Sequence, residues 1–434
     1  MRIRPAHFAG LGALAFFVAG LSLLHSRFAI ESDSLALRLG VTFVLAFLIL
    51  LVVRYIALLW LGYLHHIESK VTSDGVLIHE PVTVVVPAFN EGAMIQAAIR
   101  SLLDLDYPEY DILVIDDGST DDTHARAREL EGSYGNITVR VIRKAHGGKA
   151  SALNTGIALA ETPYVVCMDG DCRLSRDTLR YGMRHFADPR VGAVAGNVKV
   201  VNRNNLWTRL QALEYIEGLN LVRRAQGFLR AVNIIPGPLG LFRREVLVNA
   251  GGYATDTFAE DADLTLTILT AGWQIAYEER AIAWTEAPEE LLSLIKQRYR
   301  WTRGILQALR KRGATRASSR SGVVVWVSLH AMLFEAIIWP AMNVLGNLFF
   351  TVAALSTGAA SAVVYWWLLL TMLDVAAALL SIAMEREDLA LVPYALLYRF
   401  LFISIIDVAK LFATGEELAR VRMTWGKLER VGRI

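Results

Sequence analysis

The chain has 434 residues, of which 54% are hydrophobic and only 20% are charged, and this apolar surplus argues against an entirely soluble protein. Lysine and arginine number 44 against 42 aspartates and glutamates, and the net charge of +2 excludes a chain-wide basic surface for binding nucleic acid. The two cysteines, Cys167 and Cys172, are too few for a disulfide framework, so we interpret them as small buried hydrophobic residues.

Two apolar runs precede residue 71. The run Pro5–Ser26 contains no aspartate, glutamate, lysine or arginine, and it matches the length of about 20 residues that one membrane crossing needs. A secretory signal is the alternative, because arginines precede this run, but no clear small-residue cleavage site follows it. A second run, over residues 39–64, is interrupted only by Arg54 and is expected to cross back. Residues 1–70 are therefore predicted to form two transmembrane helices with both ends in the cytoplasm.

Residues 71–320 alternate short apolar runs with helical stretches, which predicts a cytosolic α/β domain. Short apolar runs at Val82–Val86, Ile112–Ile115, Val139–Ile142 and Tyr164–Met168 are predicted strands. Helical stretches follow them, as at residues 121–130 and 149–160. Strands of this kind are buried on both faces of a mostly parallel sheet, whose ligands gather at the carboxyl ends of the strands. The predicted fold class is thus a Rossmann-like α/β domain inserted between N-terminal and C-terminal transmembrane helices.

Residues 321–413 are again apolar and are expected to form transmembrane and interfacial helices. Helices near 323–355 and 363–383 are long enough to span a bilayer. The tail, residues 414–434, is basic and favours the cytoplasm, yet three C-terminal crossings would place it outside. The conflict is resolved if 391–413 lies in the interface or re-enters the membrane, and the sequence leaves this topology open.

Polar residues follow the first two predicted strands. Pro87 and the pair Asn90-Glu91 follow the first, and Asp116-Asp117 follow the second. Such side chains can accept hydrogen bonds from a nucleotide base and from ribose hydroxyls. Each one alone is explained as a helix cap, but two strand ends that face one crevice favour a nucleotide site.

Two further motifs carry charge toward the same edge of the sheet. In His146-Gly-Gly-Lys149, glycine N–H groups and a lysine can bind a diphosphate, although a plain helix start explains the pattern equally well. After the fourth strand, Asp169-Gly-Asp171 offers alternate carboxylates of the kind that hold Mg²⁺ or Mn²⁺.

Two motifs on later helices complete the set. Glu260-Asp261 begins an amphipathic helix, either as a cap or with Asp261 as a general base. In Gln297-x-x-Arg300-Trp301, the arginine can clamp a diphosphate and the indole can stack on a sugar. The basic residues after Arg303 are interpreted as a juxtamembrane belt that binds anionic lipid.

In this order, Asp117, Asp169-x-Asp171, Glu260-Asp261 and Gln297-x-x-Arg300-Trp301 resemble the processive membrane glycosyltransferases of family 2, with a GT-A nucleotide-sugar domain between membrane helices. The sequences of the motifs are most similar to those of bacterial poly-β-1,6-N-acetyl-D-glucosamine synthases. Two departures are Ala259, where the family usually has threonine, and the lack of an appended cyclic-dinucleotide-binding domain, which argues against a cellulose synthase.

The resemblance implies a role for each matching residue. Asp261, beside Glu260, would be the catalytic base, and Asp171 would hold the metal. Substrate binding would fall to Pro87, Asn90, Glu91, Asp116, Asp117, Lys149, Asp169, Gly237, Pro238, Leu239, Gln297, Arg300 and Trp301. Within this set, Asp117 would recognise uracil, Arg300 would clamp phosphate, Trp301 would form part of the acceptor platform, and residues 236–240 would line the sugar pocket.

The resemblance also implies an activity and its partners. We expect inverting, processive transfer of N-acetylglucosamine from UDP-GlcNAc to a growing polysaccharide, coupled to export across a bacterial inner membrane. The cofactor would be Mg²⁺ or Mn²⁺, the surroundings a lipid bilayer, and a small two-helix membrane subunit would be a partner. The alternatives are a chitin- or hyaluronan-like synthase, a polyprenyl-phosphate monoglycosyltransferase, a transporter, or an inactive nucleotide-sugar sensor.

Polar residues inside the C-terminal apolar helices have two explanations. Glu335, Asn343, Asn347 and Asp374 can line an export route, because such groups are costly to bury against lipid. Hydrogen bonding between helices explains each of them equally well.

Overall fold

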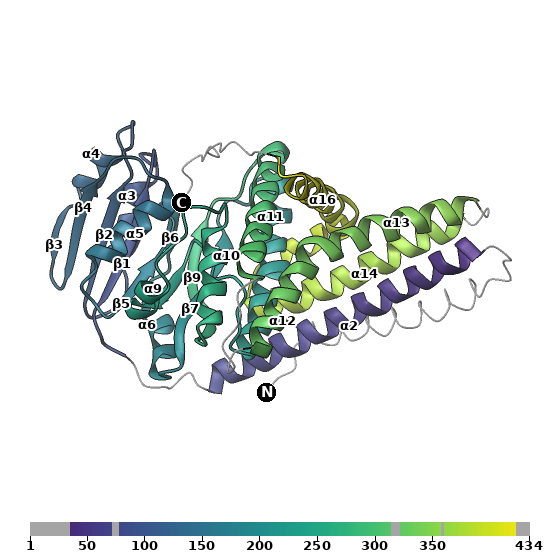
Figure 1. Cartoon of the computed structure of the whole chain (residues 1–434), viewed down its shortest axis with the longest axis horizontal. Helices are drawn as coiled ribbons and strands as arrows, with labels where there is room; N and C mark the ends of the chain where they lie inside the picture. Colours follow the sequence, from purple (N-terminus) through teal and green to yellow (C-terminus); the bar gives the residue numbers. More distant parts are fainter. Residues whose placement is uncertain (1–34, 72–77, 314–321, 357–359, 422–434) are drawn as a thin grey trace.

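The computed structural model describes residues 35–71, 78–313, 322–356 and 360–421. These residues form a sheet domain and a bundle of long helices that extends away from it (Figure 1). The predicted first crossing, Pro5–Ser26, lies outside the described residues, as does most of the basic tail.

The sheet contains nine strands within the described residues. They are β1 (Val82–Ala88), β2 (Tyr110–Asp116), β3 (Gly132–Tyr134), β4 (Ile137–Arg143), β5 (Tyr164–Cys167), β6 (Cys172–Leu174), β7 (Val191–Val200), β8 (Gly240–Arg243) and β9 (Gln274–Thr285). Their spatial order is β3-β4-β2-β1-β5-β8-β7-β9-β6. The four predicted strands are confirmed as β1, β2, β4 and β5.

The prediction of a mostly parallel sheet is correct for only one half of it. Strands β4, β2, β1 and β5 run parallel, but β8 lies antiparallel to both β5 and β7, and β6 lies antiparallel to β9. The short strand β8 follows β5 by more than 70 residues, and the apolar pattern of a strand does not encode the direction of a distant partner. The result is a mixed sheet of the GT-A type.

Helices cover both faces of the sheet. Val82, Val84 and Val86 of β1 pack with α3 (Ile95–Leu103) and α6 (Thr178–Met183) in one core. Val85, which points to the other face, packs with α5 (Lys149–Leu159), α9 (Arg244–Asn249) and α10 (Glu260–Thr270). The helix α4 (Thr123–Arg128) packs on α3. Since both faces are covered, the carboxyl ends of the central strands are left for binding.

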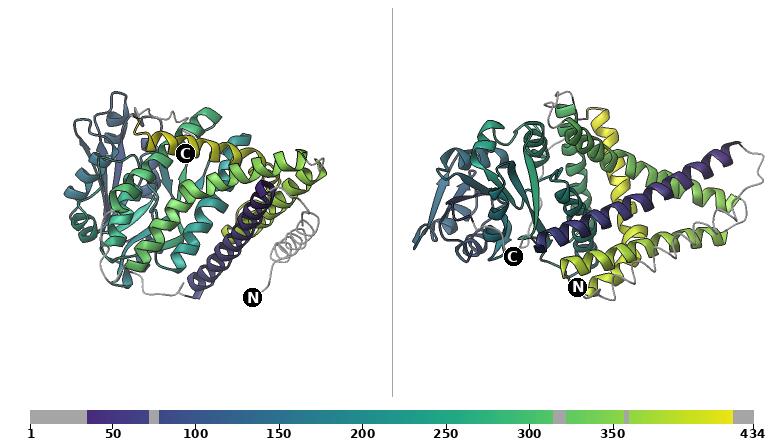
Figure 2. Two further views of the ribbon diagram at one scale, coloured as in Figure 1. Left: turned by 45° about the vertical axis from the view of Figure 1, so that its right-hand side comes forward. Right: turned by 90° about the horizontal axis from the view of Figure 1, so that it is seen from below.

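The bundle is built from long apolar helices. These are α2 (Leu35–Val71), α12 (Gly322–Leu333), α13 (Trp339–Ser356), α14 (Ala360–Glu385) and α16 (Ser404–Leu418), with short helical turns η5 (Leu389–Tyr394), α15 (Ala395–Leu397) and η6 (Tyr398–Ile403) before α16. Helices α2, α13 and α14 lie side by side and extend away from the sheet (Figures 1 and 2). In the described part, Thr42–Ser69, Gly322–Ser356, Val363–Glu385 and Leu389–Leu418 are long and apolar enough to cross a membrane.

A junction of helices joins the sheet to the bundle. It contains α7 (Leu206–Leu213), the π-helical turn η3 (Glu214–Asn220), α8 (Leu221–Phe228) and α11 (Leu291–Gly313). One apolar cluster runs from Val200 of β7 and Leu294 of α11 to Ile382 of α14 and Phe402 of η6. Helix α16 packs against both α11 and α13. The sheet domain and the long apolar helices therefore share a packed core.

Candidate active site

The first two strands place their polar residues in one hydrogen-bonded turn. Pro87 lies within β1, and Asn90 follows it with a left-handed backbone, at φ 53°. The Asn90 side chain accepts a hydrogen bond from the N–H of Thr120 at 2.8 Å, and Ser119 donates its N–H to buried Asp116 at 2.9 Å. Glu91 starts the next helical segment, where its carbonyl accepts from two backbone N–H groups.

Asp117 joins this turn to the glycine-rich motif. Its buried carboxylate accepts hydrogen bonds from the N–H of Gly147 at 3.0 Å and of Gly148 at 2.7 Å, and Lys144 binds it at 2.7 Å. Two motifs that are 30 positions apart in sequence thus form one unit. Sequence reasoning missed Lys144, although a lysine two positions before His146 is a signal for a second cation there.

Lys149 bridges two acidic motifs at the edge of the sheet. Its Nζ lies 2.6 Å from Asp169 Oδ1 and 3.1 Å from Glu260 Oε1. Burial alone would lower the pKa of Lys149, but the attraction of the two carboxylates outweighs it and raises the pKa well above its usual value. The lysine is therefore a fixed positive charge among three acidic residues, because Asp261 also acts on it.

Asp261 is a half-buried carboxylate in the first turn of α10. Burial, and then the charge of the adjacent Glu260, raise its pKa to about 6, while Lys149 opposes this. The residue at the helix cap is Ala259, which has no side-chain oxygen, and Asp261 accepts a hydrogen bond from the N–H of Ala262 at 2.8 Å. The pKa suits a group that is ionised at neutral pH and still takes up a proton.

Asp169 and Asp171 are placed to hold a divalent cation. Ligand atoms of Asp169, Asp171 and Cys172 all lie within 4.8 Å of one another. Burial raises the pKa of Asp169, and Lys149 opposes that shift. Carboxylate oxygens are the ligands that Mg²⁺ and Mn²⁺ prefer, so the two aspartates fit such an ion. Both cysteines are buried, as predicted, but the thiol of Cys172 also lies 3.4 Å from Asp171 Oδ1.

The loop at residues 236–240 lies next to Lys149 and Asp169. A Cβ atom added to Gly237 would lie 2.8 Å from Lys149 Nζ and 3.4 Å from Asp169 Oδ2, so a larger residue at this position would require the end of the Lys149 side chain to shift. Pro238 follows it in the loop. The side chain of Leu239, by contrast, is fully buried in the core of the sheet, so it supports the loop rather than lining the pocket. Its carbonyl accepts a hydrogen bond from the N–H of Gly196 at 3.2 Å.

Helix α11 brings the last motif to this edge. The guanidinium of Arg298 stacks over the indole of Trp301, with its Cζ 4.2 Å from the centre of the Trp301 ring. Arg298 also donates a hydrogen bond to the side-chain oxygen of Gln297 at 2.5 Å. Arg300 lies one position before Trp301 and is half-buried. One turn later, Gly304 contacts the backbone of Ala259, the residue before Glu260. The motif helix and the segment that carries Asp261 are therefore in direct contact.

Sequence reasoning missed the partner that orients Trp301. Arg298 forms a buried ion pair with Glu214, with Nε 3.1 Å from Oε1. The two residues are 84 positions apart, and the only signal was an acidic residue within the largely apolar segment 210–222.

Comparison with known proteins places this domain. The family described as glycosyltransferase-like family 2 matches residues 79–304, which is more than half of the chain. The chain belongs to this glycosyltransferase family. The poly-β-1,6-N-acetyl-D-glucosamine synthase of Staphylococcus epidermidis is 31% identical over 259 residues, covering 59% of this chain and 61% of the relative. The synthase of the same name from Staphylococcus aureus (strain COL) is 34% identical over 226 residues, covering 52% and 54%. The matches thus span between half and two thirds of these relatives.

A solved structure agrees with the fold. The mannosyltransferase PcManGT from Pyrobaculum calidifontis, in complex with GDP-Man and Mn²⁺, superposes with a TM-score of 0.59 at 22% identity. The superposition covers 85% of this chain and 98% of that one. At this identity the likeness supports the GT-A fold of the family 2 domain.

The basic run at the end of α11 differs from the prediction. Arg312 forms two contacts of 3.0 Å with Asp263, and Lys311 lies 2.6 Å from Asp256. These two cations are bound to carboxylates of the family 2 domain rather than left free for anionic lipid. The spacing of charges along one helix did not reveal partners that lie on a neighbouring loop and helix.

The polar residues of the bundle are bound to one another. Arg54 Nε donates to Glu335 at 2.8 Å, Asn343 donates to Asp407 at 2.8 Å, and Trp366 donates to Asn347 at 2.8 Å. Arg399 donates to both oxygens of Asp374, at 2.6 and 2.7 Å. Of the two explanations for these residues, the structure therefore favours hydrogen bonding between helices.

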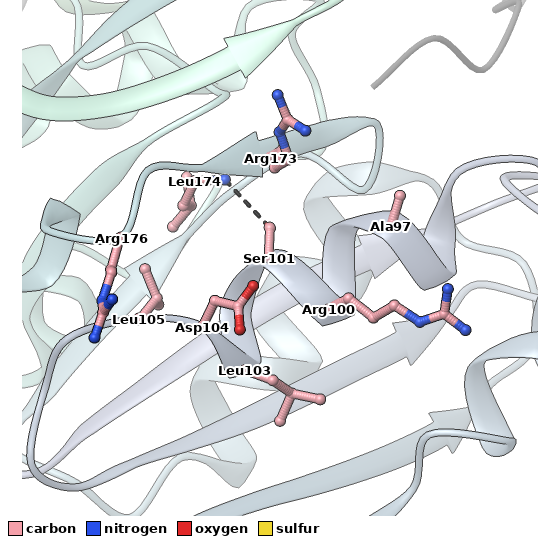
Figure 3. Close-up of a pocket in the computed structure, with 9 residues that line it drawn as sticks. All are labelled: Ala97, Arg100, Ser101, Leu103, Asp104, Leu105, Arg173, Leu174 and Arg176. Carbon is pink, nitrogen blue, oxygen red and sulfur yellow. Dashed lines mark hydrogen bonds between the residues drawn. The ribbon is translucent and has the colours of Figure 1, made fainter.

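The cavity drawn in Figure 3 lies away from this chemistry. It has a volume of about 770 Å³ and lies between α3 and β6. Its walls include three exposed arginines, Arg100, Arg173 and Arg176, whose side chains point in different directions. None of the predicted site residues lines it. The cluster at the strand ends, rather than this cavity, is the candidate active site.

Proposed function

We propose that this protein transfers N-acetylglucosamine from UDP-GlcNAc to a growing β-linked polysaccharide, with poly-β-1,6-N-acetylglucosamine as the product. One observation carries the proposal: Lys149, Asp169, Glu260 and Asp261 form a single charged cluster beside the helix that holds Gln297-x-x-Arg300-Trp301. The names of the relatives supply the sugar and the linkage.

Asp261 is the proposed general base. An acceptor hydroxyl attacks the anomeric carbon of the α-linked donor from the opposite face, and its proton passes to the Asp261 carboxylate. The bond between that carbon and the UDP oxygen breaks as the new bond forms, so UDP leaves with the electron pair and the linkage becomes β. A base in this role accelerates such a step by roughly 10²- to 10⁴-fold.

The other residues of the cluster bind the donor. Lys149 and Arg300 place positive charge next to the diphosphate, where charge develops as UDP leaves. Asp116, Asp117 and Asn90 hold the turn that faces the base and ribose. A divalent cation at Asp169 and Asp171, when bound, supplies further neutralisation of the phosphate charge. Gly237 lets the loop at residues 236–240 lie close to Lys149 and Asp169 at the proposed donor site.

The acceptor end lies next to the membrane helices. Trp301 packs on the apolar cluster that includes Tyr398 and Ile382, and this favours transfer of a chain that leaves through the bundle. Glu335, Asn343 and Asp374 are bound to residues of other helices, so these three residues support the packing of the bundle. We place the protein in the bacterial inner membrane with its family 2 domain in the cytosol, and a small two-helix subunit remains part of the proposal.

The presence of the Gln297-x-x-Arg300-Trp301 motif favours a polymerase over a monotransferase. A polyprenyl-phosphate monotransferase shares the donor residues but typically lacks this motif. Chitin- and hyaluronan-like synthases share it and differ in the product.

The test uses purified protein in lipid with UDP-GlcNAc and Mg²⁺ or Mn²⁺. We expect release of UDP and formation of long polymer, which a β-1,6-specific glycanase digests and a β-1,4-specific enzyme does not. A product with a single sugar on a lipid carrier would indicate the monotransferase instead. Digestion by the β-1,4 enzyme would indicate a different synthase.

A further inference from the structure

Helix α11 lies between the segment that carries Asp261 and the C-terminal helix α16 (Figure 1). Its motif residues, 297–301, are in its first half, and a second set of polar residues occupies the next two turns. Those later residues bind partners on both sides of the helix. These polar residues after residue 301 take no part in the proposed sugar transfer, so they have a different role.

On one side, α11 holds the backbone just before Asp261. The side-chain oxygen of Gln307 accepts a hydrogen bond from the N–H of Phe258 at 3.2 Å. The hydroxyl of Thr257 donates to the carbonyl of Gly304 at 3.4 Å. Because a backbone N–H of the segment is bonded, a shift of Gln307 moves the chain itself and not only a side chain.

On the other side, the same residues hold the end of α16. Arg303 Nε lies 2.9 Å from Glu417 Oε2, and the Arg303 guanidinium also donates to the carbonyl of Val421. The side-chain nitrogen of Gln307 donates to Glu417 Oε2 at 3.1 Å. The side chains of Arg303 and Glu417 are only 3% and 8% exposed, so breaking this ion pair is costly. Each partner also has a second, longer contact: Arg303 lies 3.7 Å from Glu416, and Arg310 lies 3.4 Å from Glu417.

Gln307 is thus a bridge between the two sides. Its oxygen binds Phe258 and its nitrogen binds Glu417, which fixes the orientation of the amide. A cavity of about 370 Å³ borders these three residues.

Helix α16 carries this link to the membrane helices. Asn343 of α13 donates to buried Asp407 of α16 at 2.8 Å. Ten residues of helix separate Asp407 from Glu417, a rigid length of about 15 Å. A displacement of α16 against α13 therefore moves Glu417 by a similar distance.

We propose that Gln307 and Glu417 are positioning residues that connect the segment before Asp261 to α16. Through this connection, the position in which α16 packs against α13 determines where the Asp261 carboxylate lies. The inference rests on the proposed role of Asp261. Neither residue touches the reacting atoms.

The first test exchanges the two side chains. Gln307→Glu places two carboxylates together, and Glu417→Gln removes the nearer of the two carboxylates that face Arg303. We expect each to lower kcat by about 10-fold, because a small misplacement of a catalytic group is costly, with the donor KM changed less than about twofold. In the combined variant the amide at position 417 can donate a hydrogen bond to the carboxylate at position 307, so one hydrogen-bond donor again faces one acceptor. The carboxylate at position 307 also remains near Arg303. The kcat of the combined variant should return to within about threefold of the wild type.

The second test does not depend on activity. Hydrogen exchange of a peptide that covers residues 257–261 should become about 10-fold faster in Glu417→Gln, because the distant change loosens the Phe258 N–H. The control is Leu418→Ala, which truncates a 75% exposed neighbour and should change neither kcat nor exchange.

The inference would be overturned by wild-type kcat in both single variants, or by exchange at 257–261 that is the same in Glu417→Gln and in the wild type. A combined variant as slow as the worse single one would also contradict it. A wild-type protein that transfers no sugar would refute the proposed function instead, and the exchange measurement then decides the link by itself.

Discussion

Gly304 offers the sharpest test of how closely α11 approaches the base segment. A Cβ atom at this position would lie 2.5 Å from the nitrogen of Ala259, 2.6 Å from its Cβ and 2.7 Å from the carbonyl carbon of Phe258. Ordinary contact begins at 3.4 Å, so roughly 1 Å of separation is missing, and two of the three atoms belong to the backbone. In Gly304→Ala the segment that leads into Asp261 must therefore move away from the helix.

A misplacement of about 1 Å at a catalytic group costs on the order of 100-fold in rate, so we expect kcat of Gly304→Ala to fall by about that factor. The assay is UDP release in lipid at saturating donor. Gly415→Ala is the matched control, because nothing lies within 4 Å of the added atom on α16, and it should keep wild-type kcat. Wild-type kcat in Gly304→Ala would refute the reasoning, since the predicted contact could then not exist.

Four other predictions concern the cluster and the bundle. Asp261→Asn should lower kcat by about 10²- to 10⁴-fold while the donor still binds, as measured by UDP release and donor titration. Because the base must be ionised and its pKa is raised to about 6, kcat/KM should be level above that pH and fall about tenfold per unit below it. A flat profile down to pH 5 would contradict the assignment. Removal of divalent cations by EDTA, and Asp171→Asn, should each abolish polymer formation, and Mg²⁺ or Mn²⁺ should restore activity only in the first case. Arg399→Gln should destabilise the protein by about 3–5 kcal/mol, because it leaves Asp374 buried without its ion pair, and denaturation in detergent should show a smaller loss when Asp374→Asn is added.

Much of the site was predictable because its residues lie at positions that chain order reveals. Asp117 and Asp169 follow apolar strands, and residues at the carboxyl ends of parallel strands meet at one edge of a sheet. Lys149 and Asp261 belong to first helical turns that start at the same edge. In each case local sequence determines where the element ends, and the fold brings those ends together.

The supporting residues were not predictable in this way. Glu214 pairs with Arg298 across 84 positions, and Gln307 binds both Phe258 and Glu417. A pattern within one helix tells which face is buried but does not tell which residue of another segment lies opposite. The same limit explains why the carboxylate partners of Lys311 and Arg312 were not predicted.

The amino-acid sequence by itself determined the apolar helices, the four parallel strands β4, β2, β1 and β5, and the acidic motifs, because hydropathy and periodicity act over neighbouring residues. Only the tertiary structure decided the antiparallel placement of β8, the contact of Gly304 with the base segment and the pairing of Asp374 with Arg399. These depend on through-space approach between segments that are far apart along the chain. Such approaches are set by how all the elements pack together, and no single stretch of residues encodes them.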